Sequence, residues 1–65
     1  MKGLYKVLCL DTGAVYGFVS GSPGEALESM LYTLNAAHRD DTAVITQSRS
    51  TLWFEHCGRT YGVRT

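Results

Sequence analysis

The chain lacks most of the features that mark specialised protein classes. Only two of its 65 residues are cysteines, too few for a disulfide framework. No apolar run reaches the roughly 7–15 residues of a signal peptide or the about 20 residues of a membrane span. We therefore expect reduced thiols, a cytoplasmic location and no contact with a membrane.

A charge excess of either sign is also missing. Six Lys and Arg residues balance six Asp and Glu residues, so the formal net charge is zero. This balance excludes a strong attraction of the whole chain to nucleic acid or to an anionic membrane. The length predicts one small domain over residues 1–65. Such a domain buries only about 60% of the surface that its unfolded chain exposes.

One helix is the most strongly marked element. Ser22 suits an N-cap, Pro23 suits the first helical position and Glu25 the third, which together form a capping box. Apolar residues then follow at helical spacing, namely Leu27, Met30, Leu31 and Leu34. The pattern predicts a helix that begins at Pro23 and fades near residues 38–39.

Strand patterns flank this helix on both sides. Residues 4–10 and 14–20 enclose the turn residues Asp11, Thr12 and Gly13, which predicts a hairpin. Residues 42–47 and 51–57 predict two further strands, and residues 60–65 an optional fifth. The order ββαββ(β) predicts an α+β fold. Its antiparallel or mixed sheet has four to five strands, with the helix on one face.

This order and length resemble the β-grasp layout of ubiquitin-like proteins and of streptococcal immunoglobulin-binding domains. The resemblance covers most of the chain as a pattern of elements, and no sequence motif accompanies it. It therefore implies a fold and no function. In a β-grasp layout the first and fourth strands are neighbours, which would bring Cys9 close to Cys57.

Residues 10–14, Leu-Asp-Thr-Gly-Ala, are similar to the catalytic segment of retroviral-type aspartic proteases. The resemblance implies that Asp11 is catalytic and that two chains each supply one carboxyl of a pair that shares a proton. The helix, however, falls where that all-β fold continues with strands. The same residues also form an ordinary hairpin turn. We interpret the segment as a turn and predict that the protein is not an enzyme.

Cys9, His38, His56 and Cys57 are the candidate zinc ligands, but their spacing is unfavourable. Structural zinc sites usually take ligands in close pairs such as Cys-x-x-Cys. His56 and Cys57 are adjacent within a predicted strand, so their side chains should point to opposite faces. We predict no metal site and no other cofactor.

The predicted strands carry more large apolar residues than one helix can cover. Monomeric proteins rarely expose contiguous apolar patches beyond a few hundred Å². The surplus therefore predicts an interaction with protein, either a second copy of the chain or a larger partner. Aromatic and Arg residues dominate binding hot spots. The predicted contact residues are Tyr5, Tyr16, Phe18, Trp53, Phe54, Tyr61, Arg49, Arg59 and Arg64.

The pairing register decides which of these residues the helix hides. A small chain without chemical motifs suits a phage- or mobile-element-encoded inhibitor that binds and blocks a larger host protein or defence complex. The alternative is a small nucleic-acid-binding protein. In that case the C-terminal arginines contact phosphates and the sheet aromatics stack on bases.

Overall fold

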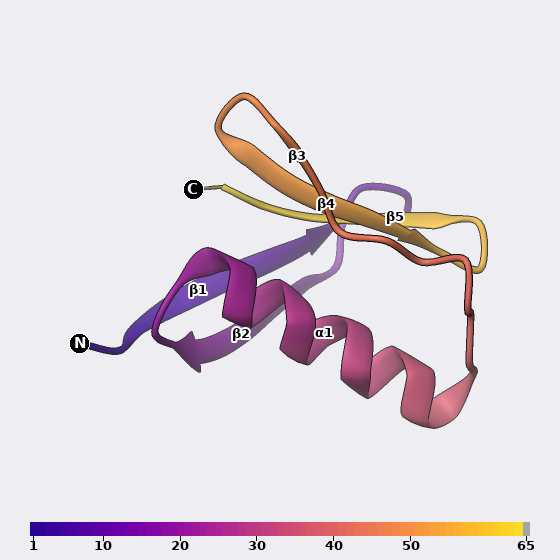
Figure 1. The fold of residues 1–65 in the computed structure, drawn as a ribbon, viewed down its shortest axis with the longest axis horizontal. Coiled ribbons are helices and arrows are strands. Elements are labelled where there is room, and N and C mark those ends of the chain that lie inside the picture. Colours follow the sequence, from indigo (N-terminus) through magenta and orange to yellow (C-terminus); the bar gives the residue numbers. More distant parts are fainter. Residues whose placement is uncertain (65) are drawn as a thin grey trace.

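The structure is a computed structural model that describes residues 1–64. It contains one helix packed on one face of a five-stranded antiparallel sheet (Figure 1). The elements are β1 (Gly3–Cys9), β2 (Val15–Ser20), α1 (Pro23–Ala37), β3 (Thr46–Ser48), β4 (Thr51–His56) and β5 (Arg59–Arg64). The predicted α+β class is confirmed. No helix within residues 1–64 has the length and apolar character needed to cross a membrane.

The first hairpin forms where the sequence predicts it. The Cys9 amide donates to the Ala14 carbonyl at 2.9 Å, and the Gly13 amide donates to the Cys9 carbonyl at 2.8 Å. Gly13 adopts φ +76°, a conformation that favours glycine. Asp11 then ties the turn to β5, because its Oδ2 accepts a hydrogen bond of 2.7 Å from the Thr60 amide.

The helix begins at Pro23 as predicted. Ser22 Oγ accepts from the Glu25 amide at 3.2 Å. The return bond of the capping box lies one residue earlier than expected, since the Glu25 side chain accepts from the Gly21 amide at 2.9 Å. The amides of Glu25 and Gly21 each thereby have a side-chain acceptor. At the other end the His38 amide still donates to the Leu34 carbonyl, so the predicted end of the helix is confirmed.

The third strand is shorter than predicted. Residues 42–47 were expected to be extended and paired, but the ladder covers only Thr46–Ser48. Asp40 explains the difference, because its Oδ1 accepts the Thr42 amide at 2.9 Å and holds that amide in a turn. Ala43 and Ile45 pack against the core from this irregular segment.

The strand order is β2-β1-β5-β4-β3. The optional fifth strand is present and lies between β1 and β4. The β-grasp expectation that the first and fourth strands are neighbours is therefore wrong. Cys9 is buried, whereas Cys57 is exposed in the turn between β4 and β5. Thr65, the last residue of the predicted fifth strand, lies outside the described residues.

The core lies between α1 and the middle of the sheet. Phe54 and Tyr61 are directly opposite each other on β4 and β5, and their rings stack with centroids 5.3 Å apart. The other buried apolar residues are Val7, Cys9, Ala26, Leu27, Met30 and Val63. The helix thus covers the sheet face that carries most of the aromatic side chains.

Candidate protein-binding face

The strand register assigns every sheet residue to one of two faces. Tyr5, Val7 and Cys9 of β1 point toward the helix, so their neighbours Leu4, Lys6 and Leu8 point away from it. We call the side turned away from the helix the open face. It carries Leu4, Lys6, Leu8, Leu10, Val15, Gly17, Val19, Thr51, Trp53, Glu55, Thr60, Gly62 and Arg64.

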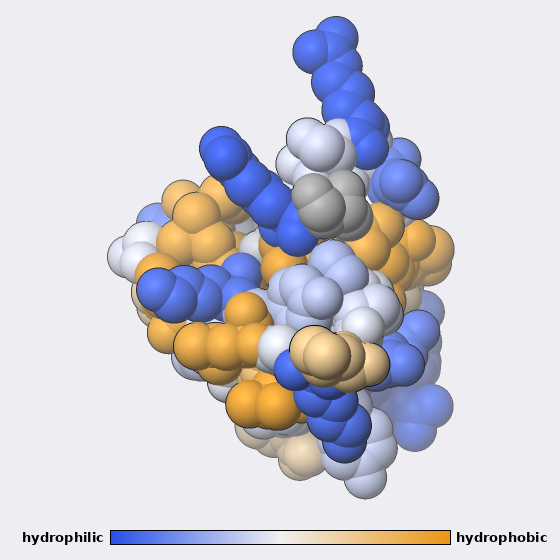
Figure 2. Space-filling view, turned by 90° about the vertical axis from the view of Figure 1, so that its left-hand side faces the viewer, coloured by the Kyte–Doolittle hydropathy of each residue, from blue (hydrophilic) through white to orange (hydrophobic). Residues whose placement is uncertain are grey.

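Aliphatic side chains dominate the half of the open face built from β1 and β2. Leu4, Leu10, Val15 and Val19 are 64%, 62%, 57% and 70% exposed, so no part of residues 1–64 covers them. Figure 2 views the molecule from the left-hand side of Figure 1, where β1 begins. Hydrophobic groups reach the surface there beside long hydrophilic side chains. Large exposed apolar patches are uncommon on monomeric proteins and are typical of interaction sites.

An open groove runs through the middle of this face, lined mainly by residues of β1, β4 and β5, with Val15 of β2 beside them. Gly62 forms its floor. The residue pairs with Leu8 on one side and with Trp53 on the other, and it has no side chain to fill the space between them. A Cβ atom at Gly62 would lie 3.5 Å from the Leu52 carbonyl oxygen and 3.7 Å from Trp53 Cβ, which are ordinary contacts. The fold therefore does not require glycine at this position.

Two cations border the groove. Lys6 on β1 and Arg64 on β5 line it, whereas Glu55 on β4 is the one acidic residue of the open face. Within residues 1–64 the ion pair present is Arg39–Asp41, which is exposed and follows α1, and neither residue lines the groove. The groove is therefore apolar at its centre and mildly positive at its border.

The structure separates the nine predicted contact residues. Trp53 and Arg64 share the open face. Tyr5 and Phe18 are half-buried against the core, and Tyr16 lies on the helix side with 39% exposure. The remaining four do not gather with them: Phe54, Tyr61, Arg49 and Arg59.

Each of these four has a physical reason for its place. Phe54 is 0% exposed and Tyr61 4%, so both serve the core and neither can contact a partner of the folded chain. Burial also raises the pKa of the Tyr61 hydroxyl. Arg49 lies in the turn before β4 and Arg59 follows the turn after it, so the two arginines lie at opposite ends of that strand.

The nine predicted contact residues do not include the aliphatic residues of the open face. The chief ones are Leu8, Leu10, Val15 and Val19. A signal for them existed in β5, where Tyr61 and Val63 alternate with Thr60, Gly62 and Arg64. That alternation marks the inner face of β5, and pairing then fixes the inner faces of β4 and β1.

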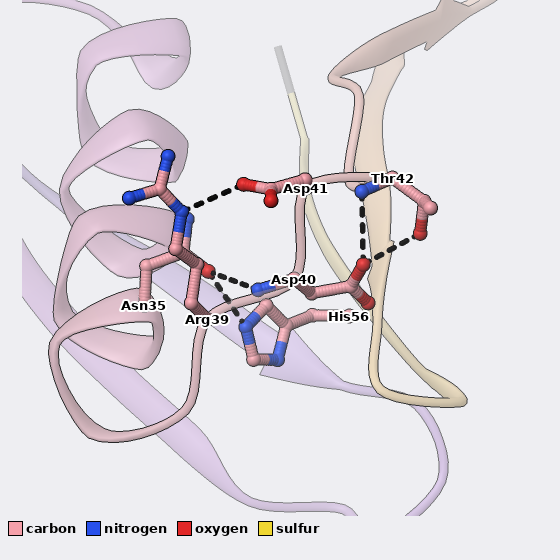
Figure 3. A network of polar contacts seen from close by, with 6 residues as sticks. All are labelled: Asn35, Arg39, Asp40, Asp41, Thr42 and His56. Carbon is pink, nitrogen blue, oxygen red and sulfur yellow. Dashed lines mark hydrogen bonds and ion pairs between the residues drawn. The ribbon is translucent and has the colours of Figure 1, made fainter.

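A polar network joins the helix end to the opposite edge of the core (Figure 3). Asn35 Oδ1 accepts from the Asp40 amide at 3.0 Å and from His56 Nε2 at 2.9 Å, so Nε2 of this buried imidazole carries a proton. Asp40 Oδ2 accepts from the Cys57 amide at 2.7 Å. This amide, together with the Thr42 hydroxyl and amide, lowers the pKa of Asp40 to about 2.

These contacts give the remaining chemical motifs structural roles. His56 is held by Asn35, and the Asp40 bond fixes the turn at Cys57 and Gly58, whose φ values are +49° and +80°. The carboxylate of Asp11 is likewise bound to the β5 backbone. Among residues 1–64, no three His, Cys, Asp or Glu side chains gather as metal ligands would.

Comparison with known proteins adds no relative: no family model, no curated protein and no solved structure matches the chain. The open face itself is therefore the basis for a functional proposal.

Proposed function

We propose that the protein is a non-enzymatic interaction module that binds another protein through its open face. The observation that carries the proposal is the row of aliphatic side chains beside the Gly62 groove, which the helix leaves uncovered. Burying apolar surface contributes about 25 cal/mol per Å². Leu4, Leu10 and Val19 already lie at the surface, so they reach a partner without rearrangement of the fold.

The chemistry of the face indicates the kind of surface that it fits. An apolar ridge of the partner would enter between Leu8 and Trp53, above Gly62. Acidic side chains beside that ridge would lie opposite Lys6 and Arg64, where complementary charge favours association and orients the encounter. A small protein that binds such a surface suits the role of a phage- or mobile-element-type inhibitor, which blocks a larger host protein or defence complex.

Site-specific photo-crosslinking tests the proposal. A photoreactive residue replaces Leu10 on the open face or, as the control, Tyr32 on the outer side of the helix. Both positions are highly exposed, at 62% and 80%. Illumination in the source cells should give a discrete protein adduct from position 10 and none from position 32. Equal adducts from both positions, or none from position 10, would contradict the proposal.

Nucleic-acid binding is the second candidate, supported by the presence of Trp53, Lys6 and Arg64 on one face. An aromatic ring between cations can stack on a base while the cations contact phosphates. Binding of single-stranded oligonucleotides that weakens with salt and is lost in Trp53→Ala/Arg64→Ala would favour this candidate. Arg49→Ala/Arg59→Ala is the matched control, since those arginines lie at opposite ends of β4.

A further inference from the structure

The sheet has two edges, and they differ in how they are protected. Natural edge strands are usually short, charged, interrupted by proline or bulged, because unpaired backbone groups otherwise recruit another strand. The β3 edge is short and polar: it has three residues, Thr46–Ser48, and Arg49 follows it. The β2 edge has six residues, Val15–Ser20, without a charge or a proline. Its six consecutive pairs with β1 contain no bulge.

The hydrogen-bond pattern identifies the free groups of β2. The Cys9 amide bonds the Ala14 carbonyl, and bonding residues alternate along an antiparallel pair. Ala14, Tyr16 and Phe18 therefore bond to β1. The amides and carbonyls of the intervening residues, Val15, Gly17 and Val19, point away from the sheet.

We propose that the β2 edges of two copies pair antiparallel about a two-fold axis at Gly17, which joins two sheets into one of ten strands. In this register Val15 lies opposite Val19 of the other copy, and Tyr16 lies opposite its Phe18. The register joins β-branched residues on the open face and aromatic residues on the helix face, both favourable cross-strand pairs. It also pairs every outward amide and carbonyl of Val15, Gly17 and Val19.

Two further observations favour a second copy as the occupant of this edge. No charged side chain lies on β2, so no like charges lie directly opposite each other in the new ladder. A two-fold interface must be self-complementary, and the Gly17-centred register meets that condition for both faces of the strand. Leu4 of the same chain leans over Gly17, with its Cδ1 3.3 Å from the position of a Cβ there. A side chain introduced at residue 17 therefore has to displace this flexible group by a few tenths of an ångström.

The edge pairing does not rest on the proposed function. It uses the backbone of β2 and brings Val15 and Val19 of the open face to the junction, but it leaves Gly62 and its neighbours Leu8 and Trp53 free. Disulfide trapping tests the register. In a Cys57→Ser background, Gly17→Cys places two thiols across the axis, where paired Cα atoms are about 5.5 Å apart and within disulfide range. The control, Val19→Cys, places its two thiols roughly 14 Å apart along the strands.

Mild oxidation should convert most of the Gly17→Cys protein to a covalent dimer and leave the Val19→Cys protein monomeric on a non-reducing gel. Circular dichroism establishes that both variants are folded. The absence of a dimer from Gly17→Cys, or equal dimer yields from both variants, would overturn the proposal.

Sedimentation equilibrium tests the association without an introduced thiol. The native chain should approach twice its monomer mass as its concentration rises. Val15→Lys/Val19→Lys and Val15→Glu/Val19→Glu should each weaken self-association at least about tenfold, and their mixture should form a 1:1 heterodimer. Leu10→Glu, which alters the open face outside β2, should dimerise normally. A native chain that stays monomeric, or a dimer lost only in Leu10→Glu, would contradict edge pairing.

Discussion

Leu8 and Trp53 lie on either side of Gly62, and each pairs with that glycine from a neighbouring strand. Gly62 lines the groove of the open face and places no side chain between these two larger ones. Glycine weakens a strand by roughly 0.5–1 kcal/mol relative to alanine. The position therefore costs stability, and the groove is what glycine provides there.

Gly62→Ala should separate folding from binding. The added Cβ meets only ordinary contacts of 3.5–3.8 Å, so the free energy of unfolding should rise by about 0.5–1 kcal/mol. The methyl group fills the floor of the groove, so affinity for the partner should fall about tenfold. Urea unfolding and a binding titration measure the two effects. A destabilised variant, or unchanged affinity, would contradict the role assigned to this glycine.

Trp53 and Phe54 are adjacent in sequence, but Trp53 lies on the open face and Phe54 lies in the core. Phe54→Ala removes a buried ring stacked on Tyr61 and should cost about 3–5 kcal/mol, enough to unfold much of a small domain. Trp53→Ala trims a half-buried side chain of the open face, so it should leave the fold intact and weaken partner binding. Thermal melts of the two variants check the contrast. Equal losses of stability would contradict the assignment of faces.

This contrast also shows what the sequence could predict. The helix between Ser22 and His38 and the first hairpin carried local signals, namely a cap, an apolar stripe and a turn, so both were predictable. The faces of the sheet depend on pairing between distant strands. Phe54 and Trp53 are both aromatic, and nothing within β4 tells which ring packs under α1. The hairpin turn at Cys57 and Gly58 decides it by aligning Phe54 with Tyr61.

The short third strand was unpredictable for a different reason. Residues 42–47 have the composition of a strand. The Asp40 side chain, however, accepts a hydrogen bond from the Thr42 amide, and strand pairing begins only at Thr46. The first and fourth strands are not neighbours, because the optional fifth strand lies between β1 and β4.

Asp40 should make stability depend on pH in the acid range. Its pKa is about 2 in the folded chain and about 3.9 in an unfolded one. The stabilisation is therefore fully present above about pH 4 and is lost as the pH falls toward 2. Asp40→Asn should destabilise the protein at pH 7 and only about half as much at pH 3.

Urea unfolding at several pH values measures this effect. Asp41→Asn is the matched control, because Asp41 forms only the exposed pair with Arg39 and should show little effect at any pH. A destabilisation by Asp40→Asn that is the same at pH 7 and pH 3 would show that the charge of Asp40 is not what stabilises the turn.

Substitutions at Asp11 test whether residues 10–14 form only a structural turn or act as a protease motif. Asp11→Asn keeps an oxygen that can accept from the Thr60 amide, so stability and partner binding should remain unchanged. Asp11→Ala removes that acceptor and should cost about 1 kcal/mol. Chemical unfolding of both variants tests the order. Peptide cleavage by the native chain that disappears in Asp11→Asn would instead establish catalysis.

Affinity capture with variants that carry introduced charges tests the central claim, that the open face is the binding surface, most directly. The native chain, Leu4→Glu/Leu10→Glu and the control Tyr32→Glu change exposed positions, so all three should fold and melt similarly. From a lysate of the source cells, the native chain and Tyr32→Glu should retain the same protein. The open-face variant should retain at least about tenfold less of it. Equal retention by all three chains would contradict the account.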